Sequence, residues 1–256
     1  MKLPLRRTSL HREVPFSFRC MKCGQCCRNK KIQVNPYEVA RLAHILRMST
    51  AAFIGRYTRN NGTVLDCKKD GTCVFLSVLG CGVHAARPLV CRLYPLGRHV
   101  FVTGKESFSE IAPDVKCKGV YGEDGWIASY LKLQGTFPFM EAADQYLGLL
   151  SRLCRILDEE AKDPDKRDVV QYVLQKSVDE DGVSDIGLAD VDAIVEAFCE
   201  KLHVPLPQNI NAKISMHIRA VEAWANSTRR RAKHEDKIAK RMDGKRSGKK
   251  TSAKGN

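Results

Sequence analysis

Four cysteines within eight residues constrain this chain more than any other feature of its 256-residue sequence. They form the run Cys20-x2-Cys23-x2-Cys26-Cys27, which a hydrophobic core does not explain, because small thiols so close together bury little apolar surface. Two intervening residues allow both sulfurs to reach one metal from a single tight turn, and Gly24 gives the backbone the freedom to make that turn. The run therefore predicts a metal site.

The number and context of the other cysteines favour metal ligation over disulfide bonds. The chain has 11 cysteines, which is an odd number. No stretch is apolar and long enough to span a membrane, and residues 1–19 lack the unbroken apolar segment of a signal peptide. We therefore expect a cytoplasmic protein without membrane contact, in a compartment where thiols stay reduced and disulfides are rare.

Eight clustered cysteines can fill two four-ligand sites, whether the metal is zinc or a four-iron cluster. The predicted ligands are Cys20, Cys23, Cys26, Cys27, Cys73, Cys81, Cys91 and Cys117. Cys67 is a ninth candidate, as a spare or a substitute. Neighbouring side chains diverge, so Cys26 and Cys27 are expected to serve different sites or different faces of one site. Cys154 and Cys199 fall on apolar faces of predicted helices and are expected to be structural.

Positive charge accompanies these cysteines in the sequence. Residues 1–120 contain nine of the 11 cysteines and carry 21 Lys and Arg against 7 Asp and Glu. Bound thiolates leave a negative site, and nearby cations offset that charge and lower thiol pKa values. Arg87 and Arg92 are the candidate cofactor-binding side chains, expected to hold thiolates or cluster sulfurs through charge-assisted hydrogen bonds. The alternative interpretation is a basic surface without a metal role.

The sequence changes character near residue 120, which predicts an α+β fold in two parts. Residues 16–120 are expected to form a small, loop-rich cysteine domain with short strands and helices. An irregular N-terminal arm at 1–15 precedes it, and an α-helical domain at 121–225 follows it. Residues 226–256 are predicted to be a disordered basic tail, because they carry 12 Lys and Arg against 3 acidic residues.

Local signals place several elements. Asn35, Pro36 and Glu38 have the pattern of a capped helix start, and apolar residues follow at helical spacing. A second short helix is predicted over 50–57, with strands over 63–65, 97–104 and 108–111. Further along the chain, turn residues separate predicted helices over 123–134, 139–162, 165–176, 188–203 and 211–231.

Together these motifs resemble the CxxCxxCC cysteine-cluster family (YkgJ-like), whose members are described as zinc- or iron-chelating. The likeness runs from about Phe18 to Gly119. It comprises the CxxCGxCC start, the helix near Asn35, Asp70-Gly71-x-Cys73-Val-Phe75-Leu76, Cys81, Arg87-Pro88, Cys91-Arg92, Tyr94-Pro95 and a late Cys117. Two positions depart from the family pattern. His84 stands where relatives tend to have Tyr, which makes it a candidate extra ligand, and Lys118 stands where Pro often follows the cysteine.

Three functions are compatible with this pattern. The first is a protein with iron–sulfur clusters, 4Fe-4S in form, that serves electron transfer or maturation of a partner; the ferredoxin-like spacing and the scarcity of histidine favour it. The second is a structural zinc protein that recognises a partner. The third follows from the resemblance, because flagellin lysine methylases share the cysteine motif: an enzyme that modifies protein lysines, although no S-adenosylmethionine site is recognisable.

The expected partner is an unidentified protein. The basic tail is also a candidate for non-specific contact with nucleic acid, because Lys and Arg release counterions when they neutralise phosphates. No arrangement of residues identifies a catalytic group.

Overall fold

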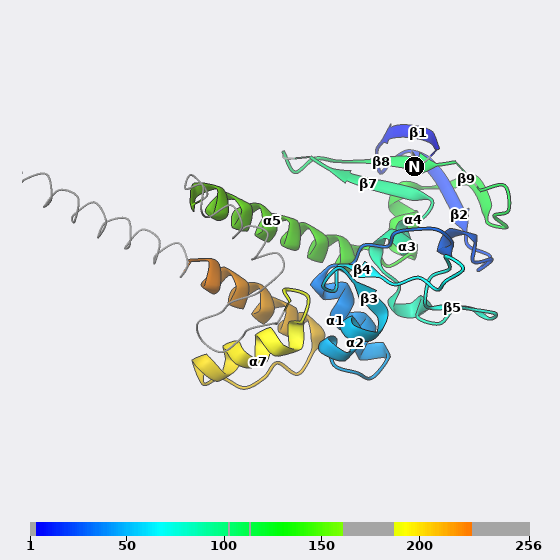
Figure 1. Ribbon diagram of the computed structural model, residues 1–256. Helices are drawn as coiled ribbons and strands as arrows, with labels where there is room; N and C mark the ends of the chain where they lie inside the picture. Colours follow the sequence, from blue (N-terminus) through cyan, green and yellow to red (C-terminus); the bar gives the residue numbers. More distant parts are fainter. Residues whose placement is uncertain (1–3, 102, 113, 161–186, 227–256) are drawn as a thin grey trace, which may run out of the picture.

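The computed structural model describes residues 4–101, 103–112, 114–160 and 187–226. Strands and loops gather at one end of the molecule, and the long helix α5 (Phe137–Glu160) leads from there to the helices near the other end (Figure 1). Helices and short antiparallel strands both occur, which confirms the predicted α+β class. The helix predicted over 165–176 and residues 227–256 of the predicted tail lie outside the described residues.

A three-stranded antiparallel sheet ties the N-terminus to the middle of the chain. Strand β8 (Glu106–Ile111) lies between β1 (Leu5–Leu10) and β7 (Leu96–Val100). The β7–β8 hairpin agrees with the two strands predicted for this part of the sequence. Residues 5–10, by contrast, form β1 instead of part of the irregular arm that the sequence predicts. The side chains of β1 are mostly exposed, so no apolar alternation indicates this strand.

A two-stranded ribbon crosses the domain boundary predicted at residue 120. Strand β2 (Pro15–Arg19) pairs with β9 (Val120–Trp126), and helix α4 (Ile127–Leu133) follows directly. This helix begins later than predicted, because the chain up to Trp126 is taken by the pairing with β2. Phe16 and Phe18 of β2 belong to one buried cluster with residues of α4 and α5. Packing is therefore continuous from the first strands into the helices.

Helix α1 (Pro36–Ile45) starts where the sequence predicts, with a complete capping box. The Asn35 side chain accepts a hydrogen bond from the Glu38 amide, and the Glu38 carboxylate accepts one from the Asn35 amide. Glu38 is buried, and its other oxygen accepts a hydrogen bond from the amide of Leu89 at 2.6 Å. Leu89 begins the short helix α3 (Leu89–Leu93), so one carboxylate holds the starts of two helices together.

The remaining elements of the N-terminal half are short. They are helix α2 (Thr50–Tyr57), the paired strands β3 (Thr58–Arg59) and β4 (Val64–Leu65), the paired strands β5 (Leu76–Ser77) and β6 (Gly80–Cys81), and the 3-10 helices η1 (Gln25–Cys27) and η2 (His84–Ala86). Helix α2 and strand β4 agree with the predictions for these segments. Apart from α1 and α2, the cysteine-bearing half of the chain is mostly loop.

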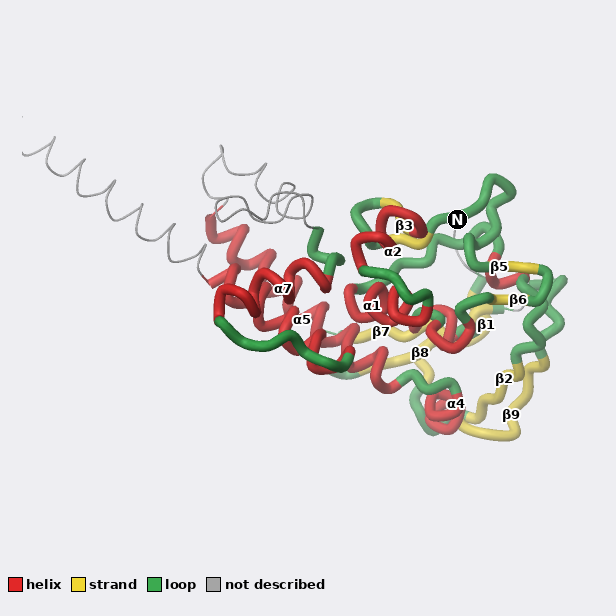
Figure 2. The backbone as a smooth tube through the Cα atoms, turned by 90° about the horizontal axis from the view of Figure 1, so that it is seen from below, coloured by secondary structure: helices red, strands yellow, loops and turns green. Residues whose placement is uncertain are grey.

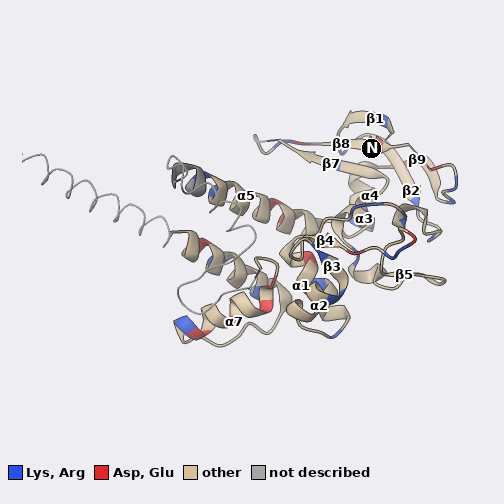
Figure 3. Cartoon of the chain, in the orientation of Figure 1, with Lys and Arg blue, Asp and Glu red and all other residues tan. Residues whose placement is uncertain are grey.

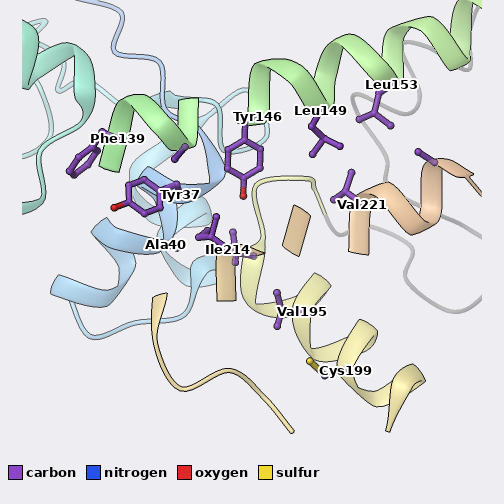
Figure 4. Packing of buried hydrophobic residues seen from close by; sticks show 13 residues of the cluster. Tyr37, Ala40, Phe139, Tyr146, Leu149, Leu153, Val195, Cys199, Ile214 and Val221 are labelled. Atoms are coloured by element: carbon purple, nitrogen blue, oxygen red, sulfur yellow. The ribbon is translucent and has the colours of Figure 1, made fainter. Parts of the chain in front are cut away.

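The helices far from the cysteine loops share one hydrophobic cluster. Helices α5 and α7 (Val191–Leu202) and a helix over 210–226 enclose it, together with residues of α1 (Figure 4). Cys199 is buried in this cluster, as expected, whereas Cys154 is exposed because its neighbour Leu153 takes the buried position. No helix among the described residues combines the length and the apolar character needed to cross a lipid bilayer.

His217 makes this core sensitive to acid. The residue is 1% exposed, and its Nδ1 lies 2.9 Å from the hydroxyl of Tyr146. Burial lowers the pKa of His217 from 6.5 to about 4, so the folded protein keeps the ring neutral. The unfolded chain takes up a proton as the pH falls below the ordinary pKa, so stability that is present at neutral pH is lost toward pH 4. We expect a loss of about 2 kcal/mol at pH 5.

Urea unfolding followed by circular dichroism at pH 7 and pH 5 measures this loss. The variant His217→Asn has no ring to titrate, and we expect its stability to change less between the two pH values than that of the unmodified chain. An equal change in both proteins would show that another group causes the acid sensitivity.

Candidate metal centre

The predicted ligands concentrate in two loop stretches, residues 20–31 and 66–82, at the strand-rich end of the molecule (Figure 2). Neither stretch contributes a buried hydrophobic side chain to the core. The buried hydrophobic residues that flank them are Phe18 and Ile32 around the first stretch, and Leu65 and Val83 around the second. The apolar contacts of these loops are limited to partly buried residues, such as Phe75, which packs against the core cluster around α1 and α2. Their cysteines are Cys20, Cys23, Cys26, Cys27, Cys67, Cys73 and Cys81.

Backbone hydrogen bonds join the two loop stretches to each other. The Asn29 amide donates to the Gly71 carbonyl at 2.8 Å, and the Cys73 amide donates to the Cys27 carbonyl at 2.8 Å. Gly71 has a φ of 77°, and a Cβ at this position would lie 2.2 Å from the side-chain oxygen of Asn29. The left-handed φ favours glycine here, and any other residue would also have to displace the side chain of Asn29. These bonds place Cys73 beside Cys27, although the two are far apart in the sequence.

Five thiols are close enough to influence one another's ionisation; we call Cys26, Cys27, Cys73, Cys81 and Cys91 the inner thiol group. Burial raises the pKa of Cys91, and charge on Cys26, Cys73 and Cys81 raises it further. The hydrogen bond with Cys26 and then burial raise the pKa of Cys27. Several neighbouring thiolates repel one another, so a bound cation would favour the ionised form of the whole group.

Cys26 ionises more readily than its neighbours in this group. Its Sγ lies 4.0 Å from the Sγ of Cys27. The hydrogen bond between these thiols lowers the pKa of Cys26 to about 7, and the charges of Lys30 and Arg87 act in the same direction. A large fraction of Cys26 is therefore thiolate at neutral pH, which is the form that binds metals.

Cys23 and Cys117 form a second group beside Tyr94. Burial raises the pKa of Cys23, but hydrogen bonds from two backbone amides and from the Cys117 thiol outweigh this effect and lower it. Burial also raises the pKa of Cys117, which takes part in a hydrogen bond with the Tyr94 side chain. Cys20 is exposed and lies at the edge of the inner thiol group, where its charge acts on Cys81.

The donor set fits a thiophilic metal, although the side chains do not form a closed ligand shell. Among the described residues, no three His, Cys, Asp or Glu side chains stand in an arrangement that would hold a metal ion. The donors that gather in the inner thiol group are all thiols, and an all-thiolate set suits zinc and iron–sulfur clusters. Because most of these cysteines lie on loops without buried hydrophobic residues, their side chains can adjust to a metal with little loss of packing.

Arg87 lies near the thiols but forms its hydrogen bonds elsewhere. Its guanidinium donates to the His84 carbonyl at 2.8 Å and to Oε1 of Gln134 at 2.6 Å. The charge of Arg87 is a smaller cause of the low pKa of Cys26, and it opposes the burial that raises the pKa of Cys81. Arg87 thus acts on the cysteines through its charge, and the hydrogen bonds described for it reach oxygen and nitrogen atoms.

His84 is not arranged as an extra ligand. The Arg87 guanidinium lies 3.1 Å from Nδ1, so this ring nitrogen accepts a hydrogen bond. A neutral imidazole that accepts at Nδ1 carries its proton on Nε2. Burial and then the charge of Arg87 lower the pKa of His84, which keeps the ring neutral. In this arrangement neither nitrogen offers a free lone pair to a metal.

Arg92 has a structural position instead of the sulfur-binding one that the sequence predicts. It is buried, and its three guanidinium nitrogens donate to the backbone carbonyls of Arg87, Gln134 and Ala85 at 2.9, 2.9 and 2.6 Å. The guanidinium also lies 4.1 Å from the ring centroid of Phe139. Arg92 therefore joins η2, α3 and the end of α4, and the hydrogen bonds described for it go to carbonyl oxygens and not to sulfur.

Exposed basic side chains and an open cleft border the cysteine loops. Figure 3 shows Lys and Arg on the loops at this end of the molecule, and Arg19 and Lys22 are exposed. The cleft has a volume of about 1020 Å³ and runs from Cys20 along β2, β9 and α4. Tyr121 and Tyr130 are among its lining residues. Solvent and small molecules can therefore approach the cysteine loops from the Cys20 side.

Comparison with known proteins agrees with this arrangement of thiols. The family model CxxCxxCC, described as "Putative zinc- or iron-chelating domain", matches residues 19–118. A protein of Methanocaldococcus jannaschii, named "Uncharacterized protein MJ0661", is 30% identical over 138 residues, which cover 52% of this chain and 71% of that protein. The chain belongs to the CxxCxxCC family. No solved structure matches the chain significantly.

Membership of the CxxCxxCC family confirms the resemblance predicted from the motifs. The matched residues contain all nine cysteines of the N-terminal half and end before β9 begins. Because the family is described as zinc- or iron-chelating, its match supports metal binding by these cysteines. The helices from α4 onward lie outside the match. The family model therefore says nothing about how they pack against the CxxCxxCC region.

Two side chains near the thiols of this CxxCxxCC protein have no role assigned from the sequence. Lys30 contributes to the low pKa of Cys26, after the hydrogen bond from Cys27, and Tyr94 is hydrogen-bonded to Cys117. Tyr94 belongs to the Tyr94-Pro95 dipeptide shared with the family. This shared motif could have identified Tyr94 as a residue of the site. Lys30 is one of many exposed basic residues, and nothing in its sequence context distinguishes it.

Proposed function

We propose that this protein carries an iron–sulfur cluster on its cysteine loops, 4Fe-4S in form, for electron transfer or for maturation of a protein partner. The observation that carries the proposal is the inner thiol group, in which five cysteines from distant parts of the chain lie near enough for their charges to act on one another. A 4Fe-4S cluster requires four thiolates, and the ferredoxin-like spacing of the first three cysteines supports the same choice.

When bound, the cluster would supply a one-electron redox centre. The chain's own residues would hold it and balance its charge. Cys26, already partly ionised at neutral pH, is the first thiol that we expect to bind. Lys30 and Arg87 contribute positive charge beside it, which favours the thiolate form and offsets the negative charge of a thiolate-bound centre.

A structural zinc site is the second candidate, and one observation favours it. The loops at 20–31 and 66–82 contribute no buried hydrophobic side chain. Small domains that fold around zinc have this property, because the metal replaces the core as the source of stability. In this alternative the metal only holds the loops, and the surface around them recognises a partner.

Purification of the full chain without oxygen, followed by a visible spectrum and by iron, zinc and sulfide determination, distinguishes the two metals. We expect a coloured protein with iron and acid-labile sulfide in similar molar amounts. The variant Cys26→Ser should lose most of the metal, whereas Cys154→Ser, which changes an exposed cysteine on α5, should keep it. A colourless protein with stoichiometric zinc would reject the iron–sulfur proposal in favour of the structural zinc site, and one without metal would reject both.

A further inference from the structure

Cys67 lies directly opposite Cys73 in a short antiparallel pairing of the chain. The amides of these two cysteines point to other acceptors: the Cys67 amide donates to the side chain of Asp66, and the Cys73 amide donates to the Cys27 carbonyl. Backbone hydrogen bonds instead flank the pair on both sides. They run from the Lys68 amide to the Thr72 carbonyl at 2.7 Å and from the Val74 amide to the Asp66 carbonyl at 3.2 Å.

This pattern defines Cys67 and Cys73 as a non-hydrogen-bonded pair. In such a pair the Cα atoms are about 4.5 Å apart and the two side chains leave the same face of the ladder. Zinc and thiolate sulfur are about 2.3 Å apart, so two sulfurs on one tetrahedral ion are about 3.8 Å from each other. The spacing of the pair matches this separation, and both sulfurs can reach one ion without movement of the backbone.

The pair also lies beside the first cysteine loop. The Sγ of Cys67 is 3.8 Å from the carbonyl oxygen of Lys30, which follows the CxxCxxCC run closely in the sequence. The amide of Cys73 is bonded to the carbonyl of Cys27 at 2.8 Å. Cys73 belongs to the inner thiol group, and Cys67 adjoins it through this pairing.

We infer that Cys67 is a metal ligand and that it binds as a chelating pair with Cys73. This inference rests on the proposed metal-binding function and specifies the site that a single ion would occupy. The ligand is a thiophilic ion such as zinc, because each iron of a 4Fe-4S cluster binds only one cysteine. Cys67 thus has a defined partner, in place of the spare or substitute role left open by the sequence.

The decisive experiment uses the full chain loaded with ¹¹³Cd under reducing, oxygen-free conditions. Cadmium binds thiolates, and its scalar coupling to cysteine β-protons identifies each ligand by NMR. We expect the β-protons of Cys67 and Cys73 to correlate with the same cadmium resonance. A spectrum in which Cys73 correlates with cadmium and Cys67 does not, or in which they correlate with different ions, overturns the inference and leaves metal binding intact. No correlation from any cysteine overturns both.

A second measurement uses matched variants. Cadmium–thiolate absorption in the ultraviolet increases with the number of bound thiolates. The variant Cys67→Ser should therefore absorb less than the unmodified chain, by the amount that one bound thiolate contributes. Cys154→Ser is the control and should leave it unchanged, because this exposed cysteine lies on α5. Unchanged absorption in Cys67→Ser also counts against the inference. Should Cys67→Ser fail to fold, the NMR experiment on the unmodified chain still decides the question.

Discussion

Removal of the bound metal by a chelator under reducing conditions will unfold the cysteine loops and leave the helical core folded. Residues 20–31 and 66–82 contribute no buried hydrophobic side chain, so backbone bonds and the partly buried ring of Phe75 are the main contacts that remain to hold them when the metal is gone. The cluster formed by α5, α7 and α1 has its own buried residues and contains none of the predicted ligands. Structural zinc contributes about 10–16 kcal/mol in small domains, which indicates the scale of the loss.

Hydrogen exchange followed by mass spectrometry measures this difference segment by segment. We expect peptides that contain the Asn29 and Cys73 amides to exchange rapidly after chelation, because these amides form the bonds between the loops. Peptides from α5 and α7 should exchange as slowly as before. Addition of the metal back to the same sample is the control and should restore slow exchange in the loops. Equal protection of the loops before and after chelation would mean that the metal does not stabilise them.

Replacement of Arg92 by Met is expected to destabilise the protein by about 3–5 kcal/mol. The guanidinium donates to three backbone carbonyls, and the residue is buried, so the variant leaves these acceptors without a partner. Each unsatisfied buried group costs about 1–3 kcal/mol. The contact with the ring of Phe139 is lost as well. Lysine at this position should restore only part of the stability, because its single nitrogen does not reproduce the planar fork.

Urea unfolding of Arg92→Met and of the control Arg56→Met measures this effect. Arg56 is exposed, and its replacement should change stability by about 0.5 kcal/mol or less. The metal content per folded Arg92→Met molecule separates the two roles considered for this residue. We expect this content to be unchanged, because Arg92 bonds carbonyls and not sulfur. Loss of metal with little loss of stability would instead support the sulfur-binding role predicted from the sequence.

Local patterns predicted those parts of the fold that depend on neighbouring residues. The capping box of α1 is an example, because Asn35 and Glu38 satisfy each other's backbone groups within one turn. The β7–β8 hairpin is another, since its alternation is visible over adjacent residues. Strand β1 could not be predicted in this way. Most of its side chains are exposed, and its partner β8 lies about a hundred residues later in the chain.

In the candidate site, too, features set by neighbouring residues were predictable, whereas contacts between distant segments were not. The motif spacing identified the thiols, but it did not indicate which of them meet. That depends on the bonds between the two loops, such as the one from Asn29 to Gly71, and no repeating pattern encodes them. Arg92 shows why chemistry alone is insufficient: an arginine between two cysteine motifs suggests a sulfur contact, whereas each of its three nitrogens donates to a backbone carbonyl brought near by tertiary structure.

The pairing of β2 with β9 also sets an order of events during synthesis. The CxxCxxCC run leaves the ribosome roughly ten seconds before β9, at ordinary rates of translation. During this time its thiols are exposed without the strand that later lies beside them. Cys117 is only three residues from the start of β9, so the last predicted ligand and the closing strand emerge together. Completion of the centre and closure of the ribbon therefore become possible at the same stage of synthesis.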